Sequence, residues 1–285
     1  MENDKLLKTL ERIADTLERI SPPKPTPTNL EVGDAFVWNA DNETLELIIN
    51  VSKIQIQLLK GIELQQKELL KNTRQFASGF PANNILLWGA RGTGKSSLVK
   101  AAHSQVNDES DFKLVLIEIH REDIQTLPKL LRVISLSRRR IIIFCDDLSF
   151  DGGDNSYKSL KTILDGGLQG KPENILFYAT SNRRHLMARD MIENESSTAI
   201  NPNESIEEKV SLSDRFGLWL GFHNIDQDTY FNIVGTYAEY YKLDIAQETL
   251  KTEANEWAVT RGARSGRVAW QFIQNLAGRL GKTLS

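Results

Sequence analysis

The sequence predicts an α/β fold in which a parallel sheet is flanked by helices, with a helical extension before it and an all-helical lid after it. Three observations support this prediction. Five apolar runs alternate with helical patterns between residues 85 and 222, as in parallel sheets whose crossover helices cover both faces. A glycine-rich loop joins the first run to the helical pattern after it. From residue 226 onward the periodicity is helical throughout.

Residues 1–20 predict an amphipathic helix. Their apolar side chains recur at alternating spacings of four and three residues, which is a coiled-coil seam of about two heptads. Because two heptads are marginal alone, residues 4–20 either bind a helical protein partner or pack on the body of their own chain. Residues 21–30 hold four prolines, which exclude helix and predict an extended linker. The seam residues are Leu6, Leu10, Ile13, Leu17 and Ile20.

Residues 31–80 predict a helical extension. Leu45, Ile48 and Ile49 are spaced as on one face of a helix, and similar spacing follows them. A Gly-Phe-Pro sequence at residues 79–81 marks the end of this pattern, because glycine and proline both interrupt helices.

Residues 81–222 form the predicted α/β domain, and residues 223–285 the predicted lid. Ligands of an open parallel sheet bind at the carboxyl ends of its strands, so polar residues after each apolar run are candidate site residues. The acidic, Ser- and Asn-rich segment 192–208 predicts an exposed insertion. The predicted strands are Ile85–Trp88, Leu114–Ile119, Ile141–Cys145, Ile175–Ala179 and Leu218–Phe222. The predicted lid helices lie near residues 227–241, 246–260 and 264–280.

The composition indicates an ordinary globular protein of 285 residues, with a net charge of −3 and a pI near 5.9. This charge exerts no overall attraction on nucleic acid or anionic membranes, so nucleic-acid binding is a secondary hypothesis. The basic run 138–140 is more typical of a helix end than of a nucleic-acid site. A single cysteine, Cys145, excludes an internal disulfide, and the polar start of the chain lacks a signal-peptide core. We therefore expect a cytoplasmic protein with no membrane association.

The loop after the first apolar run has the pattern G-x-x-x-x-G-K-S, which binds the phosphates of nucleoside triphosphates. Its glycines let the backbone N–H groups point inward, and the helix that follows adds its positive N-terminal dipole. Lys95 is expected on the β- and γ-phosphates, and Ser96 offers its hydroxyl to Mg²⁺. The loop residues expected to bind the cofactor are Gly89, Ala90, Arg91, Gly92, Thr93, Gly94, Lys95, Ser96 and Ser97.

Two carboxylates follow the apolar run that ends at Cys145. Asp146 is the candidate Mg²⁺ ligand, and Asp147 is the candidate that polarises the attacking water. Alone, two Asp residues after a strand are as typical of a helix cap or a turn. The phosphate loop favours the functional interpretation, because the carboxyl ends of parallel strands meet at one edge of the sheet.

Five motifs follow one another along the chain. They are the phosphate loop, Asp146-Asp147, Ala179-Thr180-Ser181-Asn182, Ser213-Asp214-Arg215-Phe216, and the helix with Arg264 and Arg267. This order resembles that of the AAA+ ATPases, a class of P-loop NTPases, over residues 55–280. Within the class, the chain is similar to a bacterial family of predicted ATPases labelled domain of unknown function 815. The resemblance implies ATP as the nucleotide and carries over no substrate.

The resemblance also implies roles for three further residues. Asn182 resembles the first sensor, whose amide bonds the γ-phosphate or its water, and an Asn that ends a strand in a turn is the alternative. Arg215 resembles the arginine finger, which acts in trans within a homo-oligomer, and a surface pair with Asp214 is the alternative. Arg267 resembles the second sensor better than Arg264, although either arginine could reach phosphate.

Two departures from the AAA+ pattern bear on function. Most active members have Glu where this chain has Asp147, which is one methylene shorter and predicts slow turnover. No aromatic-apolar-Gly triplet lies between Glu118 and Leu136, where the threading unfoldases of the superfamily have their pore loop. Protein unfolding by threading is therefore disfavoured.

The sequence thus predicts Mg²⁺-dependent ATP hydrolysis in an oligomer that acts on a macromolecular target. The alternative is a nucleotide-gated module that assembles on DNA or on a protein partner with negligible hydrolysis, which Asp147 and the N-terminal helix both favour. A nucleotide or small-molecule kinase is a third hypothesis, and the helical lid and the Arg215 motif weaken it.

Overall fold

The computed structural model describes residues 29–135, 137–150, 156–165, 172–184, 186 and 212–284, together with six residues near the N-terminus. Those six are helical and exposed, and they are Leu7, Thr9, Leu10, Arg12, Ile13 and Thr16. Most of the predicted helix over residues 1–20, most of the predicted linker over 21–30 and the predicted acidic insertion over 192–208 therefore lie outside the described residues.

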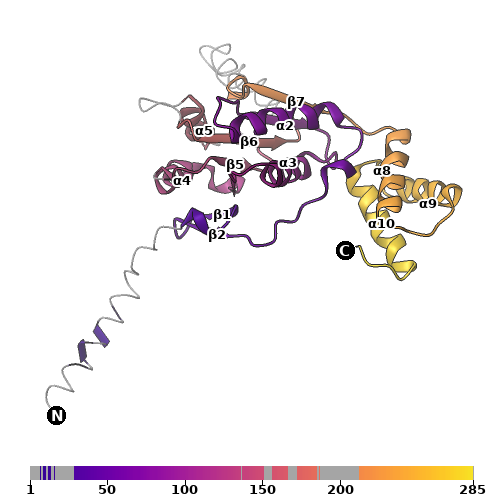
Figure 1. Ribbon diagram of the computed structural model, residues 1–285, viewed down its shortest axis with the longest axis horizontal. Helices are drawn as coiled ribbons and strands as arrows, with labels where there is room; N and C mark the ends of the chain where they lie inside the picture. Colours follow the sequence, from indigo (N-terminus) through magenta and orange to yellow (C-terminus); the bar gives the residue numbers. More distant parts are fainter. Residues whose placement is uncertain are drawn as a thin grey trace, which may run out of the picture.

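A seven-stranded sheet, in the order β2-β1-β4-β5-β6-β3-β7, forms the middle of the described structure (Figure 1). Every neighbouring pair is parallel except β1 and β2, which form an antiparallel hairpin at one edge. The predicted parallel sheet is confirmed. The strands are β1 Ala35–Asn39, β2 Thr44–Leu47, β3 Ile85–Gly89, β4 Val115–Glu118, β5 Ile141–Cys145, β6 Ile175–Ser181 and β7 Leu218–Phe222.

The hairpin corrects the helical prediction for residues 34–47. Phe36 and Trp38 are each 1% exposed and alternate with less buried neighbours, which is the period of two that a half-covered strand has. On β2, Leu45 is buried, whereas Ile49 lies beyond the end of the strand and is 84% exposed. Leu45 and Ile49 have helical spacing in the sequence, but in the structure their side chains do not share a buried face.

Helices cover both faces of the sheet. The helices α2 and α3 share one apolar core with the strands, and η3, α4 and α5 share a second core with the opposite strand faces. The bounds of the five are α2 Glu63–Ala77, α3 Lys95–Glu109, η3 Arg121–Thr126, α4 Leu127–Ile134 and α5 Ser156–Asp165. Two short 3₁₀ helices precede them along the chain, η1 Leu30–Val32 and η2 Ile56–Leu58. The predicted helical extension thus begins as strands and becomes a regular α-helix only at α2.

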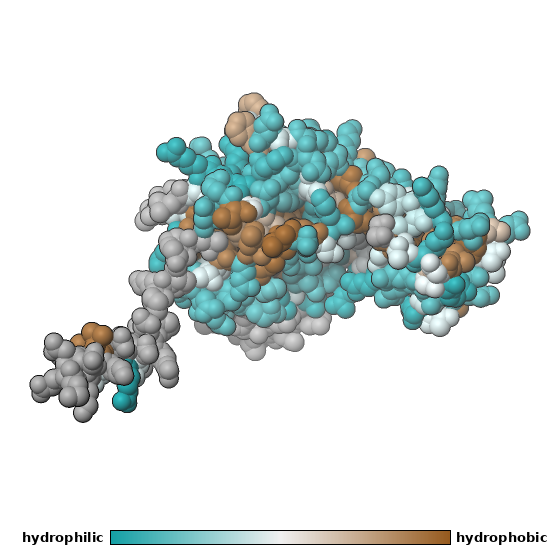
Figure 2. All heavy atoms as spheres, turned by 60° about the horizontal axis from the view of Figure 1, so that its bottom comes forward, coloured by the Kyte–Doolittle hydropathy of each residue, from teal (hydrophilic) through white to brown (hydrophobic). Residues whose placement is uncertain are grey.

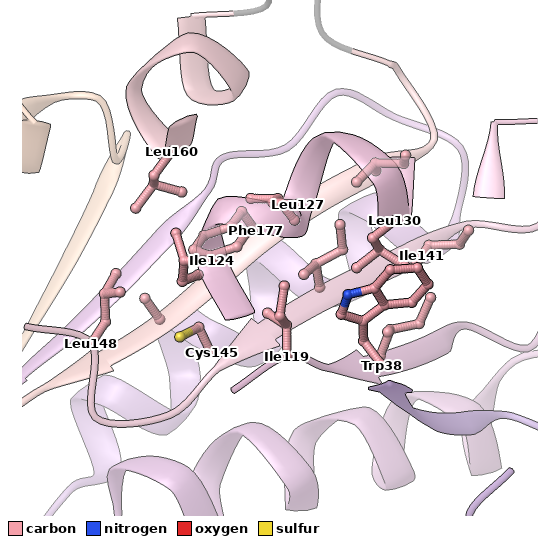
Figure 3. Packing of buried hydrophobic residues seen from close by; sticks show 14 of the residues in the cluster. Trp38, Ile119, Ile124, Leu127, Leu130, Ile141, Cys145, Leu148, Leu160 and Phe177 are labelled. Carbon is pink, nitrogen blue, oxygen red and sulfur yellow. The ribbon is translucent and has the colours of Figure 1, made fainter. Parts of the chain in front are cut away.

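The strand β5 shows how the two cores divide. Ile141, Ile143 and Cys145 pack against η3, α4 and α5, and Ile142 and Phe144 pack on the other face. Figure 3 shows Ile141 and Cys145 of this group among side chains from the hairpin and the covering helices. Burial raises the pKa of the Cys145 thiol, which is therefore a protonated core residue. Full burial on both faces holds the carboxyl end of β5 in a fixed position.

The C-terminal region forms a helical lid with its own apolar core. Its helices are α8 Gln227–Tyr240, α9 Gln247–Thr260 and α10 Gly266–Arg279. Figure 1 shows them packed together at one end of the sheet. Leu58 packs in the lid core, while the next residue, Leu59, packs in the core under α3. The segment that contains η2 therefore joins the lid to the sheet.

The basic run at residues 138–140 is largely structural. Arg139 donates to the carbonyl oxygens of Leu30 and Gly33 and pairs with Asp34. Arg140 donates to the carbonyl oxygen of residue 79 at 2.9 Å. These bonds hold the start of the hairpin and the end of α2 to the sheet, so only Arg138 of the run is exposed. This arrangement removes the support that the run gave to a nucleic-acid site.

The edge strand β2 leaves part of its surface apolar. Leu47 and Ile48 are 39% and 36% exposed, and Val32 in η1 is 58% exposed. Figure 2, which turns the lower side of Figure 1 toward the viewer, shows apolar surface gathered in the middle of that side.

None of the described helices has the length and apolar character needed to cross a membrane.

Candidate nucleotide-binding site

The glycine-rich loop lies between β3 and α3, at the carboxyl edge of the sheet. Gly89, Gly92 and Gly94 have φ angles of 129°, 72° and 92°, which side chains disfavour. A Cβ atom on Gly89 would lie 1.9 Å from the carbonyl oxygen of Phe222 on β7. That oxygen also accepts from the N–H of Ala90 at 3.0 Å. The loop conformation and its contact with β7 therefore require glycine at the first position.

Lys95 lies at the mouth of the loop and is 7% exposed. Its Nζ donates to the carbonyl oxygens of Gly89 at 2.9 Å and Ala90 at 2.7 Å, and lies 3.4 Å from Asn182 Oδ1. Burial lowers the pKa of Lys95, and the nearby carboxylates of Asp146 and Asp147 oppose that shift. The cation is thus held by acceptors that phosphate oxygens can replace.

Ser96 and Asp146 place two oxygen atoms side by side next to Lys95. Ser96 Oγ donates to Asp146 Oδ1 at 2.5 Å, and Thr180 Oγ1 donates to the same oxygen at 2.5 Å. A hydroxyl and a carboxylate are ligands that suit Mg²⁺. The Ser96 hydroxyl and the Asp146 carboxylate therefore fit a Mg²⁺ ion whose remaining ligands are phosphate oxygens and water. Among the described residues no group of three or more His, Cys, Asp or Glu could hold a metal ion.

Asp147 has an unusual backbone conformation that directs its side chain. Its φ angle is 52°, in the left-handed region, and its N–H donates to Thr180 Oγ1 at 2.9 Å. Asp is more tolerant of this region than Glu. Asn182 Nδ2 donates to Asp147 Oδ1 at 2.5 Å. Asn182 therefore contacts both Asp147 and Lys95, and the three polar side chains converge on one point.

The lid helix α10 begins against the phosphate loop. Ser265 caps the helix by accepting from the N–H of Val268 at 3.2 Å. The N–H of Arg267 lies 3.4 Å from the carbonyl oxygen of Gly92, and a Cβ atom on Gly266 would lie 3.1 Å from it. Arg267 lines the cavity around the loop. Of the two arginines that the sequence left open, Arg267 is the one that the fold brings to the site.

A cavity of about 1400 Å³ surrounds the loop. Its polar part contains the phosphate loop, the two carboxylates and Asn182, and its apolar part lies between residues 54–62 and the lid. It is larger than the roughly 300–1,000 Å³ typical of small-molecule sites. The apolar lining that could hold a base includes Leu59, Ile62, Ile225, Ile233 and Trp270.

Arg215 lies away from this cavity. It precedes β7 at the amino edge of the sheet, whereas the loop is at the carboxyl edge. Its Nε donates to Asp165 Oδ1 at 2.5 Å, at the end of α5. The fold therefore places Arg215 beside Asp165, where the sequence offered Asp214 as the alternative, and keeps the arginine out of the cavity of its own chain.

Thr180 lies in the polar motif of residues 179–182, but the sequence predicted no role for it. The hydroxyl of this 1% exposed residue bonds the side chain of Asp146 and the backbone of Asp147. The contact follows from the strand pairing, which the local sequence does not show. Cys145 lies opposite Ala179, so the next residues along the two strands, Asp146 and Thr180, are neighbours. The local sequence likewise gave no signal for the apolar lining from residues 54–62 and from α10.

A phosphate loop between β3 and α3, carboxylates after β5 and a helical lid against the loop define an AAA+ P-loop fold. Within that class, the chain belongs to the DUF815 family, described as a protein of unknown function, whose family model matches residues 31–280. The fold and the family that the sequence motifs predicted are therefore confirmed.

Two solved structures illustrate the likeness. The Aeropyrum pernix ORC1 protein in complex with DNA has 16% identity and a TM-score of 0.54, and the match covers 79% of this chain and 64% of that one. The Thermotoga maritima RuvB Holliday junction branch migration motor has 14% identity and a TM-score of 0.43, with 77% and 73% covered. The ORC1 likeness supports the fold alone. A search of curated protein sequences finds no significant match.

Proposed function

We propose that this protein binds ATP with Mg²⁺ and hydrolyses it within a homo-oligomer, so that the nucleotide cycle moves the lid and acts on a macromolecular target. The observation that supports this most is the convergence at the loop mouth. Asn182 contacts Lys95 through its oxygen and Asp147 through its nitrogen. A cation, an amide and a carboxylate around one point are the groups that γ-phosphate and an attacking water require.

In this proposal the loop N–H groups and Lys95 hold the phosphates. Lys95 Nζ exchanges the carbonyl oxygens of Gly89 and Ala90 for phosphate oxygens, and the N-terminus of α3 adds its dipole. The base occupies the apolar part of the cavity, between Ile62 and the lid residue Trp270. Binding therefore joins the sheet to the lid through one ligand.

Ser96 and Asp146 are the residues that would hold Mg²⁺, which when bound neutralises charge on the phosphate oxygens. Thr180 keeps Asp146 oriented through the shared hydrogen bond. The carboxylate of Asp147 orients a water and accepts its proton, and Asn182 fixes the carboxylate and the γ-phosphate. Arg267, carried by α10 against the loop, makes the position of the lid depend on the phosphates.

Arg215 completes the site of a neighbouring subunit in this proposal. It lies outside the cavity of its own subunit, and a guanidinium contributes strongly to phosphoryl transfer when it reaches the γ-phosphate. An isolated subunit should therefore turn over slowly, and the rate per subunit should rise as the protein assembles.

The test is Mg²⁺-dependent ATP hydrolysis across a range of protein concentrations, with light scattering to follow assembly. Arg215→Ala should keep ATP affinity and lose the concentration-dependent part of the rate. The matched control is Arg138→Ala, which removes an exposed arginine far from the cavity. A rate per subunit that is constant with concentration, or full turnover in Arg215→Ala, would refute the role in trans.

A second candidate is a nucleotide-gated module that assembles on DNA or a protein partner and hydrolyses ATP negligibly. The short side chain of Asp147 favours it, as do the exposed apolar residues Leu7, Leu10 and Ile13 near the N-terminus. Tight ATP binding without turnover at every concentration, together with nucleotide-dependent binding to DNA or a helical partner, would support this candidate over the first.

A further inference from the structure

The backbone that carries Arg215 is anchored in the core. Phe216 is 2% exposed, and its ring lies 6.2 Å from that of Phe177 on β6. Its N–H donates to the carbonyl oxygen of the fully buried Ser213 at 3.0 Å. Residues on both sides of Arg215 are therefore fixed, and the direction of its long side chain is the remaining freedom.

Asp165 binds that side chain in the structure. Its Oδ1 accepts from Arg215 Nε at 2.5 Å, and the Arg215 side chain is only 21% exposed. Asp165 is the last residue of α5, where a carboxylate faces the negative end of the helix dipole. An acid at this end of a helix is unfavourable alone, and the guanidinium offsets the repulsion.

The helix that carries Asp165 is itself rigidly placed. Leu160 is fully buried and Leu164 is 9% exposed, and both pack in the core that α5 shares with the sheet. A carboxylate on a packed helix can hold a partner side chain more firmly than one on a loop. Asp214, the acid next to Arg215 in the sequence, ends a short helical stretch before β7 and is exposed.

We propose that Asp165 is a positioning residue, which holds the Arg215 side chain in the orientation that reaches the nucleotide of a neighbouring subunit. This inference rests on the proposed role of Arg215 in trans. An arginine side chain has many rotamers, so a guanidinium that is already oriented loses less freedom when it engages phosphate. Asp165 then acts on the rate of the neighbouring site and leaves nucleotide binding in its own subunit unchanged.

Mixed oligomers separate this role from a structural one. Donor subunits carry Lys95→Ala, which disables their own site but leaves Arg215 intact. Acceptor subunits carry Arg215→Ala and keep an intact site. Neither variant should hydrolyse ATP efficiently alone, and mixing them should restore activity. If mixing restores nothing, the trans role of Arg215 fails, and that failure is visible before Asp165 is changed.

Asp165→Asn is then added to one kind of subunit at a time. In the donor it should lower kcat of the mixture about tenfold without changing KM, because a misplaced catalytic group loses rate rather than binding. In the acceptor it should have no effect. Asp165→Glu in the donor should recover part of the loss, and the control Asp214→Asn in the donor should leave the rate unchanged.

Two outcomes would overturn the proposal. One is a restored rate that is unaffected by Asp165→Asn in the donor. The other is an equal fall with the change in either subunit, which would show that Asp165 only stabilises α5. The melting temperature of each variant shows whether α5 has been destabilised. Asp165→Glu keeps a carboxylate that can pair with Arg215, so a loss of rate in Asp165→Asn that Asp165→Glu partly recovers is due to the ion pair.

Discussion

Two largely buried cations at opposite edges of the sheet are held in different ways. At the amino edge, the Arg139 side chain is 14% exposed and bonds groups from separate segments, among them the carbonyl oxygen of Leu30 and the carboxylate of Asp34. At the carboxyl edge, Lys95 is 7% exposed and donates mainly to its own loop, to the carbonyl oxygens of Gly89 and Ala90.

Burial alone therefore does not identify a functional cation. Arg139 joins pieces of chain about a hundred residues apart, so its bonds belong to the fold. Among the described residues, Lys95 bonds no distant group except Asn182. Two carboxylates, Asp146 and Asp147, and two arginines, Arg91 and Arg267, lie close enough to affect its pKa. A cation whose partners are local and replaceable is the one suited to a ligand.

Lys95→Ala should have the largest effect of all the variants, on the affinity for ATP. Two charge-assisted bonds to phosphate are lost, so ATP affinity should fall by roughly a thousandfold. The melting temperature without nucleotide should stay close to that of the parent chain. Calorimetric titration with ATP and a thermal melt measure both quantities, and an affinity within threefold of the parent would contradict the assignment.

Arg139→Ala should show the opposite pattern. Leu30, Gly33 and Asp34 would lose their donor, which should lower the free energy of unfolding by about 3 kcal/mol. ATP affinity of the folded fraction should not change. Urea unfolding measures the first quantity, and Arg138→Ala is the control because that side chain is exposed. A loss of ATP affinity without a loss of stability would show that Arg139 serves the nucleotide site and not the fold.

Asp147→Asn should lower turnover about a hundredfold while ATP affinity stays unchanged, because a general base is removed and the backbone is not disturbed. Asn tolerates the left-handed φ of 52° as Asp does. Asp147→Ala should lose the same turnover and also lower the free energy of unfolding by about 1 kcal/mol. Steady-state rates and urea unfolding separate the two effects, and full turnover in the Asn variant would exclude the proposed base.

Asp147 illustrates which features of the site can be predicted from the sequence and which cannot. The phosphate loop, the carboxylates after β5 and the parallel sheet were predictable, because apolar strands and a fixed motif are local patterns. The left-handed conformation of Asp147 was not, since it depends on the hydrogen bond from its N–H to Thr180 across the strands. That conformation favours Asp over Glu at this position.

The hairpin and the partner of Arg215 escaped prediction for a related reason. Strands of four or five residues are too short for their period to outweigh a chance helical spacing, as with Leu45 and Ile49. Asp165 is 50 residues from Arg215, so their ion pair follows from how α5 packs. Contacts between distant segments are set by tertiary packing and leave little local signal.

Thr180→Val tests whether the Thr180 hydroxyl orients the carboxylates at the carboxyl edge. Valine keeps the shape but removes the hydroxyl that bonds Asp146 and the N–H of Asp147. Residues that orient metal ligands cost about 10- to 100-fold when changed, so we expect turnover to fall about tenfold and the Mg²⁺ requirement to rise. Thr180→Ser should keep most activity. A Mg²⁺ titration that matches the parent chain would show that the hydroxyl only fills space.

The ion pair of Arg74 and Glu109 provides the smallest expected effect, because both side chains are more than two-fifths exposed. The hydrogen bond from Arg74 lowers the pKa of Glu109 from 4.5 to about 2. A carboxylate with a lowered folded-state pKa stabilises the fold above its unfolded pKa and loses that contribution as pH falls from about 4.5 to 2. Solvent screening limits the contribution to about 0.5 kcal/mol. Arg74→Gln should therefore differ from the parent by that amount at pH 6 and by less at pH 3, in urea unfolding at low salt. A difference that grows toward acid would have the wrong sign for this pair, and one comparable to that of Arg139→Ala would mean that exposed and buried cations contribute alike to this fold.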